Sequence, residues 1–168
     1  MPMSFKSRNG NALVEFSLLG VPVIFITIGI LSVSINMWAF HCLAYSTEIT
    51  ARYASVHGAT CTANSNNCAI TIGDMATYYA NHALALDPGQ VIVKFSDGSG
   101  TTTCGPVNTC TSSTARFPSA LYSSVGQDVK VSATYVLNNP LGMFWPGTSP
   151  TASANYTVGA TSRQRIVF

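Results

Sequence analysis

The sequence has few charged residues. Asp, Glu, Lys and Arg make up 8% of its 168 residues, whereas a soluble globular domain typically contains about 25%. Low charge is typical of disorder only when hydrophobic residues are also scarce, and here they make up 47%, which excludes a disordered chain. The deficit comes from an apolar block near the N-terminus and from a later portion rich in Ser, Thr, Asn and Gly. The length suits one domain, or a membrane anchor with a small domain.

The chain also lacks an excess of positive charge. Its formal net charge is +2, and two of its eight basic residues, Lys6 and Arg8, precede the apolar block. The remaining six basic residues balance the six acidic ones. This balance does not support a basic surface for nucleic acid, so we predict no nucleic-acid partner.

Recognisable catalytic motifs are missing as well. The chain contains no nucleophile elbow, phosphate-binding loop or clustered acid pair. Its histidines and aspartates are scattered singly, as His41, His57, His82, Asp74, Asp87, Asp97 and Asp128. We therefore predict that the protein is not an enzyme and that it needs no cofactor.

Five cysteines indicate the compartment. Cys61 and Cys68 form one close-spaced pair, Cys104 and Cys110 form another, and Cys42 stands apart. Two close pairs in turn-rich polar sequence predict two disulfides and an oxidising compartment. Pairing within each couple is the simplest of three connectivities, and unpaired buried thiols are the alternative. A zinc site without CxxC or HxxxH spacing is a weaker alternative, drawing on His57, Cys61, Cys68 and His82.

The apolar block runs from Phe16 to Phe40 without a formal charge. As a helix it would be about 37 Å long, enough to cross a hydrocarbon core of about 30 Å. Pro22 lies inside the block and predicts a kink rather than an end, because proline is tolerated in membrane helices. The basic residues before the block place the N-terminus in the cytoplasm and the rest outside, which agrees with the cysteines.

The residues before the block have a distinctive pattern. A short leader with Lys6 and Arg8 ends in Gly10, and Glu15 is the fifth residue after it. This resembles the site at which prepilin peptidases cut type IV pilins on the cytoplasmic face. The apolar segment then remains as the N-terminal helix, whereas an ordinary secretory signal is cut after its apolar core.

The sequence is similar in particular to the TadE-like minor pilins of tight-adherence (Tad) pilus systems. Their basic leader, Gly and Val-Glu-Phe run appear here as Gly10 and Val14-Glu15-Phe16. After the membrane, that family typically continues as in Ala51-Arg52-Tyr53-Ala54, and the stretch from Val129 to Arg163 is similar in style. Residues 58–127, which hold all four paired cysteines, fall outside the resemblance.

The resemblance implies a division of the chain and a role for its first residues. Residues 1–10 would be a cytoplasmic prepilin leader, 11–57 an N-terminal helix that spans the membrane at about 16–40, and 58–168 an extracytoplasmic domain. Glu15, followed by Phe16, would act in assembly, its carboxylate pairing with the new amine of Asn11 on a neighbouring subunit. Alternatively, Glu15 merely occupies the first helical turn, where the helix dipole favours a negative charge.

The function implied is that of a non-enzymatic minor pilin of the bacterial inner membrane. Its N-terminus would be cytoplasmic and its C-terminal domain periplasmic, with the cell-surface pilus as a second location. Its partners would be other pilin-like subunits, the prepilin peptidase, the inner-membrane assembly platform and membrane lipid. The alternative is a bitopic membrane protein with a periplasmic binding or scaffold domain that does not enter a filament.

The fold predicted from these patterns is α+β. The long helix continues to about Val56 with an apolar stripe at Tyr45, Ile49, Tyr53 and Val56. A second helix is expected over 74–86 and strands over 90–95, 128–137 and 155–167, which form a mostly antiparallel sheet. The apolar loop from Leu141 to Pro146 is expected first to fill the core, and contacts with lipid or with a neighbouring subunit are the alternatives. A long helix packed on a small sheet is the economical arrangement.

We predict that the mature protein begins at Asn11, because Gly10 precedes Glu15 by five residues after a basic leader. The intact mass of protein from a host with an active prepilin peptidase should be lower by residues 1–10. Material from cells without the peptidase is the uncut control. A full-length mass in the presence of the active enzyme would contradict the assignment.

Overall fold

The computed structural model describes residues 9–57, 70–137 and 156–167, with side chains from residue 13 onward. Cys61, Cys68 and the loop from Leu141 to Pro146 lie outside the described residues, so the predictions for them remain predictions. The described elements confirm the predicted α+β fold.

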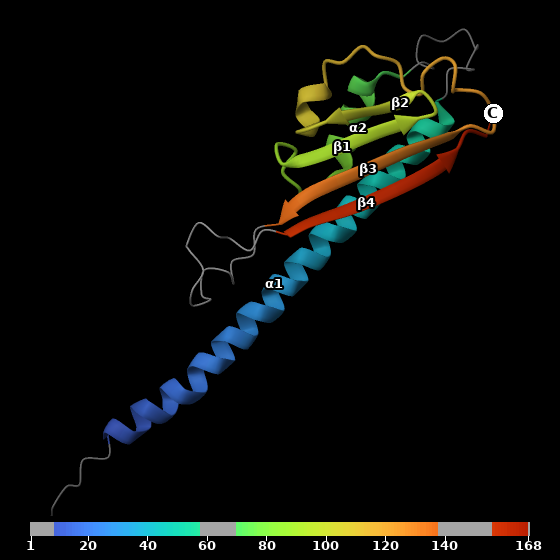
Figure 1. The fold of residues 1–168 in the computed structure, drawn as a ribbon. Coiled ribbons are helices and arrows are strands. Elements are labelled where there is room, and N and C mark those ends of the chain that lie inside the picture. Colours follow the sequence, from blue (N-terminus) through green and yellow to red (C-terminus); the bar gives the residue numbers. More distant parts are fainter. Residues whose placement is uncertain (1–8, 58–69, 138–155, 168) are drawn as a thin grey trace, which may run out of the picture.

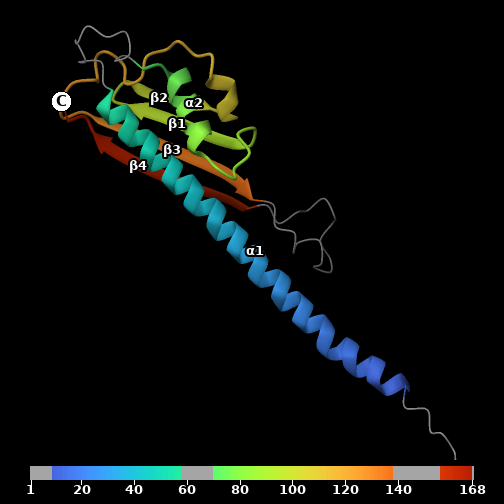
Figure 2. The same cartoon turned by 180° about the vertical axis from the view of Figure 1, so that it is seen from behind.

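Helix α1, Asn9–Val56, is the longest element, with 48 residues and a length of about 72 Å. It does not end at Pro22, as predicted, while the kink expected there stays a prediction. Its N-terminal part projects away from the rest of the protein, and only its C-terminal part lies beside the sheet (Figures 1 and 2). The helix ends near the expected residue.

Helix α2, Ile72–His82, differs from the predicted span of 74–86 at both ends. It begins two residues earlier because Thr71 caps it: the Thr71 hydroxyl accepts from the Asp74 N–H at 3.1 Å, and the Asp74 carboxylate accepts from the Thr71 N–H at 2.9 Å. It ends four residues earlier because the chain turns after His82, where Ala85 adopts a left-handed φ of 67°. The apolar face was predicted correctly, since Met75, Tyr79, Ala83 and Leu86 are buried.

Four antiparallel strands form one sheet in the order β2-β1-β3-β4. The strands are β1 Val91–Asp97, β2 Gly100–Cys104, β3 Asp128–Leu137 and β4 Tyr156–Arg165. Three correspond to predicted strands, whereas β2 was not predicted, because Gly-Thr-Thr-Thr-Cys lacks apolar alternation. The turn between β1 and β2 requires Gly98, where an added Cβ would lie 2.1 Å from Cδ1 of Tyr122.

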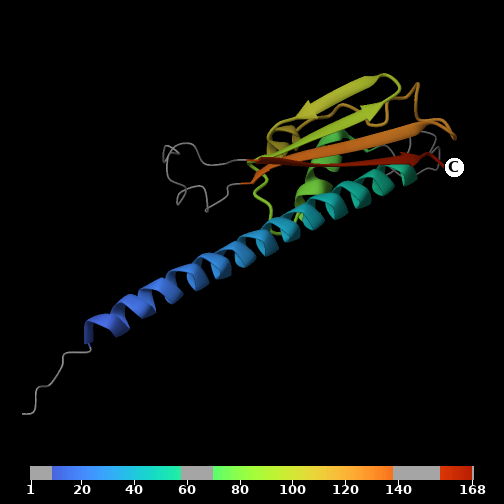
Figure 3. The ribbon, with the colours of Figure 1, turned by 60° about the horizontal axis from the view of Figure 1, so that its bottom comes forward.

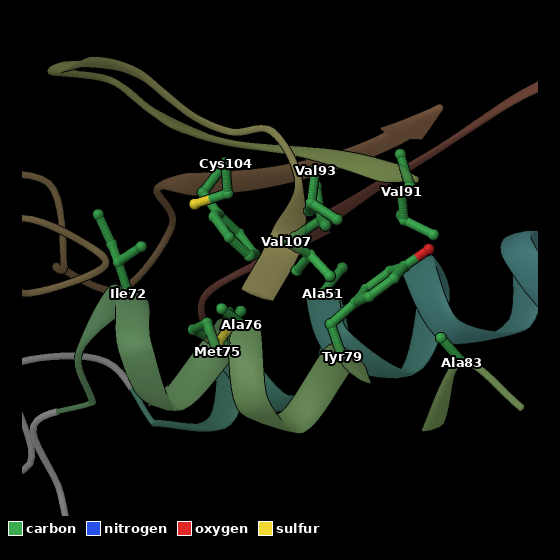
Figure 4. Close-up of a cluster of buried hydrophobic side chains, with 14 of the residues drawn as sticks. Ala51, Ile72, Met75, Ala76, Tyr79, Ala83, Val91, Val93, Cys104 and Val107 are labelled. Atoms are coloured by element: carbon green, nitrogen blue, oxygen red, sulfur yellow. The ribbon is translucent and has the colours of Figure 1, made fainter. Parts of the chain in front are cut away.

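The protein has two layers, with α1 and α2 on the same face of the sheet (Figure 3). Alternate residues of the central strands supply the sheet side of the core: Val91, Val93, Phe95, Val129, Val131 and Ala133. Against them pack Met75 and Tyr79 of α2, Ala51 of α1 and Val107 from the 3-10 turn Val107–Cys110 (Figure 4). The opposite face of the sheet carries polar side chains.

The predicted apolar stripe of α1 is wrong at two of its four residues. Tyr45 and Val56 are 59% and 55% exposed, whereas Ile49 and Tyr53 are partly buried. The buried stripe is one position away and consists mainly of small or hydroxyl side chains: Leu43, Ser46, Thr47, Thr50, Ala51 and Ala54. Small side chains allow the helix to lie close to the sheet. The Thr47 hydroxyl avoids an unpaired donor by donating to the Leu43 carbonyl at 2.7 Å.

We predict that Ala51→Leu destabilises the domain, because Ala51 is fully buried between α1 and the sheet. Inserting a larger side chain into a packed core typically costs about 1–3 kcal/mol. Urea unfolding of the protein in mild detergent, followed by circular dichroism, measures the change. Val56→Leu, at a largely exposed position of the same helix, is the matched control. Equal stability of the two variants would show that the small residues are not needed for packing.

Candidate functional site

The N-terminal half of α1 exposes an unusual amount of apolar surface. Its most apolar window of 18 residues has a mean hydropathy of 2.5, and only 6% of that window is buried. Phe16 is 79% exposed and Ile35 67% exposed. A core helix of a soluble domain buries such side chains, and apolar patches of this extent mark a surface that something else covers. By length and composition the helix can cross a membrane.

The polar side chains along this half are largely satisfied within the helix. The hydroxyls of Thr27, Ser32 and Ser34 each donate at 2.8 Å to the backbone carbonyl four residues earlier. The Ser17 hydroxyl donates to the Val14 carbonyl at 2.9 Å. Hydroxyls bonded in this way present little unmet polarity to their surroundings, so an apolar medium tolerates them.

Glu15 is the exception in this segment. It is the only Asp, Glu, Lys or Arg side chain between residues 13 and 47, and it is exposed. Its carboxylate forms no hydrogen bond or ion pair with another described residue. The Gly10–Asn11 peptide bond lies in the first turn of α1, and Asn11 precedes Glu15 by one helical turn. The helix thus brings the predicted processing site, Glu15 and the exposed Phe16 to the same end of the molecule (Figure 1).

Burial of α1 changes near residue 40. Trp38 and Tyr45 are still exposed, but Ala39 and Leu43 are buried against the core. This change coincides with the predicted end of the apolar block. Beyond it, Glu48 and Arg52 form an ion pair, with Oε1 and Nη2 2.6 Å apart. Because both side chains are more than half exposed, the pair contributes little to stability.

The predicted Cys104–Cys110 disulfide is confirmed. It joins the end of β2 to the 3-10 turn Val107–Cys110, whose Val107 is fully buried. Cys42 is a free thiol, partly buried at the edge of the core. The disulfide therefore ties the sheet edge to the turn that covers the core next to α2.

Two of the histidines lie in a stack of four rings that joins α1 to α2. The rings follow the order His57, Tyr53, Tyr78, His82, with centroids 4.1, 4.1 and 4.2 Å apart. Nδ1 of His57 lies 2.9 Å from the Tyr53 carbonyl and Nδ1 of His82 lies 2.8 Å from the Tyr78 carbonyl. The stack was not predicted, although a Tyr-x-x-x-His spacing at both places was a signal for it.

The stack argues against the zinc alternative. Two tyrosine rings lie between His57 and His82, so the two imidazoles do not bind one ion together. Among the described residues there is no group of three or more His, Cys, Asp or Glu that could hold a metal. Desolvation at the interface raises the pKa of Tyr53, with a smaller contribution in the same direction from the nearby Asp74 carboxylate. The stack is therefore a packing feature between the helices.

Two further ionisable groups have shifted pKa values for structural reasons. Burial raises the pKa of Tyr79 to about 12, because the phenolate would be poorly solvated in the core. Burial alone would raise the pKa of Asp97, but hydrogen bonds from Ser99 and from the Ser119 N–H hold it below its usual value. Asp97 thus fixes the β1–β2 turn to the segment before β3.

No family model, no curated protein and no solved structure matches the chain.

Proposed function

We propose that the chain is a non-enzymatic, minor pilin-like subunit that assembles a Tad-type pilus after a prepilin peptidase cuts it between Gly10 and Asn11. The observation that carries the proposal is Glu15. It is the lone charge in the exposed apolar half of α1, it has no partner among the described residues, and it follows the proposed cut by one helical turn.

Cleavage would create the partner that Glu15 lacks. Before the cut, the Asn11 nitrogen is part of a neutral peptide bond. After it, Asn11 carries an ammonium group at the positive end of the helix dipole, where a cation is unfavourable. Both this ammonium and the Glu15 carboxylate are costly in an apolar bundle, and each offsets the other when they are paired.

The pair is assigned to two different subunits. In one helix the Glu15 side chain leans toward the N-terminus, so it could also reach the amine of its own chain. An intersubunit pair explains more, because the exposed apolar half of α1 needs neighbours or lipid around it. Wherever neighbouring helices cover it, a pair across the contact sets the axial register of one helix against the next.

The remaining features agree with this placement. The positive residues before the apolar block favour a cytoplasmic N-terminus, and a disulfide in the domain favours the periplasm. The partners would be other pilin-like subunits, the inner-membrane assembly platform and lipid. A bitopic protein with a periplasmic binding or scaffold domain is the second candidate; the same anchor and disulfide support it, but it leaves Glu15 without a role.

We predict that Glu15→Ala and Glu15→Gln block assembly while cleavage and membrane insertion survive. Leaving one partner of a buried ion pair alone costs about 3–5 kcal/mol, enough to stop a weak polymerisation step. The measurement is co-purification of each variant with pilus or assembly partners, with the N-terminal mass as a check on processing. Ser17→Ala, which removes only an intrahelical hydrogen bond, is the control. Wild-type incorporation of both Glu15 variants would refute the pilin mechanism.

Co-expression with wild-type protein separates the two pairings. If the pair joins two subunits, the Asn11 amine of a Glu15→Ala chain can still meet a wild-type Glu15, and the variant should enter mixed assemblies in part. If each chain pairs with itself, wild-type protein gives no rescue, and the intersubunit assignment is wrong.

A further inference from the structure

The charges of the folded domain are segregated, although they cancel in the sequence outside residues 1–10. Cross-strand partners point to the same face of a sheet, so the register places four cations on the face opposite α1: Lys94, Lys130, Arg163 and Arg165. Asp128 shares this face and Asp97 lies at its edge, leaving a net charge of +2. The rest of the described chain has a net charge of −2, from Arg52 and Arg116 against Glu15, Glu48, Asp74 and Asp87.

The cations are close enough to engage one ligand together. Lys130 lies directly opposite Arg163, which puts their Cα atoms about 5 Å apart. Lys94 lies opposite Ser132, which is two residues after Lys130 on β3. The Cα atoms of Lys94 and Lys130 are therefore diagonal neighbours, about 7 Å apart. Like charges this close are unfavourable in the free protein, and Asp128 offsets only part of the repulsion, through Arg163 at 2.6 Å and Arg165 at 3.6 Å. Neither lysine forms an ion pair with another described residue.

Hydroxyl groups surround these cations. Ser96 and Thr101 are hydrogen-bonded across β1 and β2 at 2.8 Å, and Thr161 donates to Ser132 across β4 and β3 at 3.1 Å. A shallow hollow of about 300 Å³ opens at the end of the face, lined by Ser96, Asp97, Gly98, Gln127, Asp128, Lys130 and Arg163. The Asp97 carboxylate in this hollow already accepts from the backbone N–H groups of Ser99 and Ser119. The hollow thus combines fixed carboxylates with one cation, Lys130, that forms no ion pair with another described residue.

The most charged end of this face lies far from the apolar half of α1. The start of β3 and the end of β4, which carry Asp128, Lys130, Arg163 and Arg165, lie at the end of the sheet near the C-terminal end of α1 (Figures 1 and 3). A membrane around the apolar half would be at the other end of the molecule. If the α1 helices of several subunits packed together, this face would still be on the outside, because α1 covers the opposite face.

We infer that this face binds an acidic polysaccharide, with Lys94 and Lys130 as the free cations that contact its carboxylates. Charge complementarity, the row of hydroxyls and the shallow hollow suit a flexible chain of hydroxylated sugars with repeating negative charges. Nucleic acid suits the face less well, because its described outward residues include no aromatic ring on which a base could stack. The inference requires only the folded domain, not assembly into a pilus.

The test uses the full-length protein in nanodiscs of neutral lipid, with polygalacturonate as the probe. Binding should appear at low salt, fall as salt rises, and weaken roughly tenfold in Lys94→Gln/Lys130→Gln, as for the loss of two exposed charge contacts. Arg52→Gln/Arg116→Gln removes the same charge from exposed positions off this face and should bind like wild type. Circular dichroism and an intact Cys104–Cys110 disulfide check that each variant is folded.

Neutral dextran and duplex DNA complete the comparison. The inference predicts that both bind more weakly than polygalacturonate. If dextran bound as tightly as polygalacturonate, binding would not depend on charge and the inference would be wrong. If DNA bound as tightly as polygalacturonate or more tightly, the face would be reassigned to nucleic acid. Absence of polygalacturonate binding, or equal weakening in the two double variants, would overturn the assignment of the site.

Discussion

A single helix has to satisfy two different environments, and the rest of the structure depends on this constraint. Up to about residue 40, α1 exposes large apolar side chains, and most of its hydroxyl groups donate hydrogen bonds to backbone carbonyls of the same helix. From Leu43 onward the same helix buries small side chains against a sheet. Because the helix is continuous through Pro22 and the boundary, the position of the domain is fixed relative to whatever covers the apolar half.

The two-layer arrangement follows from the second environment. Ala51 and Ala54 let α1 lie close to the sheet, and the ring stack around Tyr53 and Tyr78 joins α1 to α2. Both helices cover one face of the sheet. The residues of β1 and β3 that alternate with the buried ones, most of which are polar, therefore lie on the other face. Four of the six basic residues outside residues 1–10 lie there, so the fold converts a balanced sequence into a polarised surface.

The features predicted correctly from the sequence are those that a pattern within one continuous segment specifies. The 25 uncharged residues of Phe16–Phe40 and the alternation of β3 specify one element each, and both were located correctly. The stripe on α1 was missed because hydrophobicity favoured Tyr45 and Val56, whereas close packing needed the smaller Thr50 and Ala51. Strand β2 and the end of α2 were missed because pairing with β1 and the turn at Ala85 decide them, and neither is visible as local periodicity. The Cys104–Cys110 disulfide was found from the spacing of the cysteines alone, whereas the assembly role of Glu15 stays a prediction.

The central claim is that the apolar half of α1 lies in lipid and the packed half outside it. The most direct measurement is labelling of single introduced cysteines by a membrane-impermeant maleimide, in intact membranes and with Cys42, Cys61 and Cys68 replaced by Ala so that only the Cys104–Cys110 disulfide remains. The positions are Ile24→Cys and Leu31→Cys in the apolar half and Tyr45→Cys beyond it, all exposed in the folded chain. The account predicts rapid labelling at residue 45 and protection at residues 24 and 31, which is lost once the membrane is dissolved in denaturing detergent. Labelling of all three at the same rate in intact membranes would contradict it.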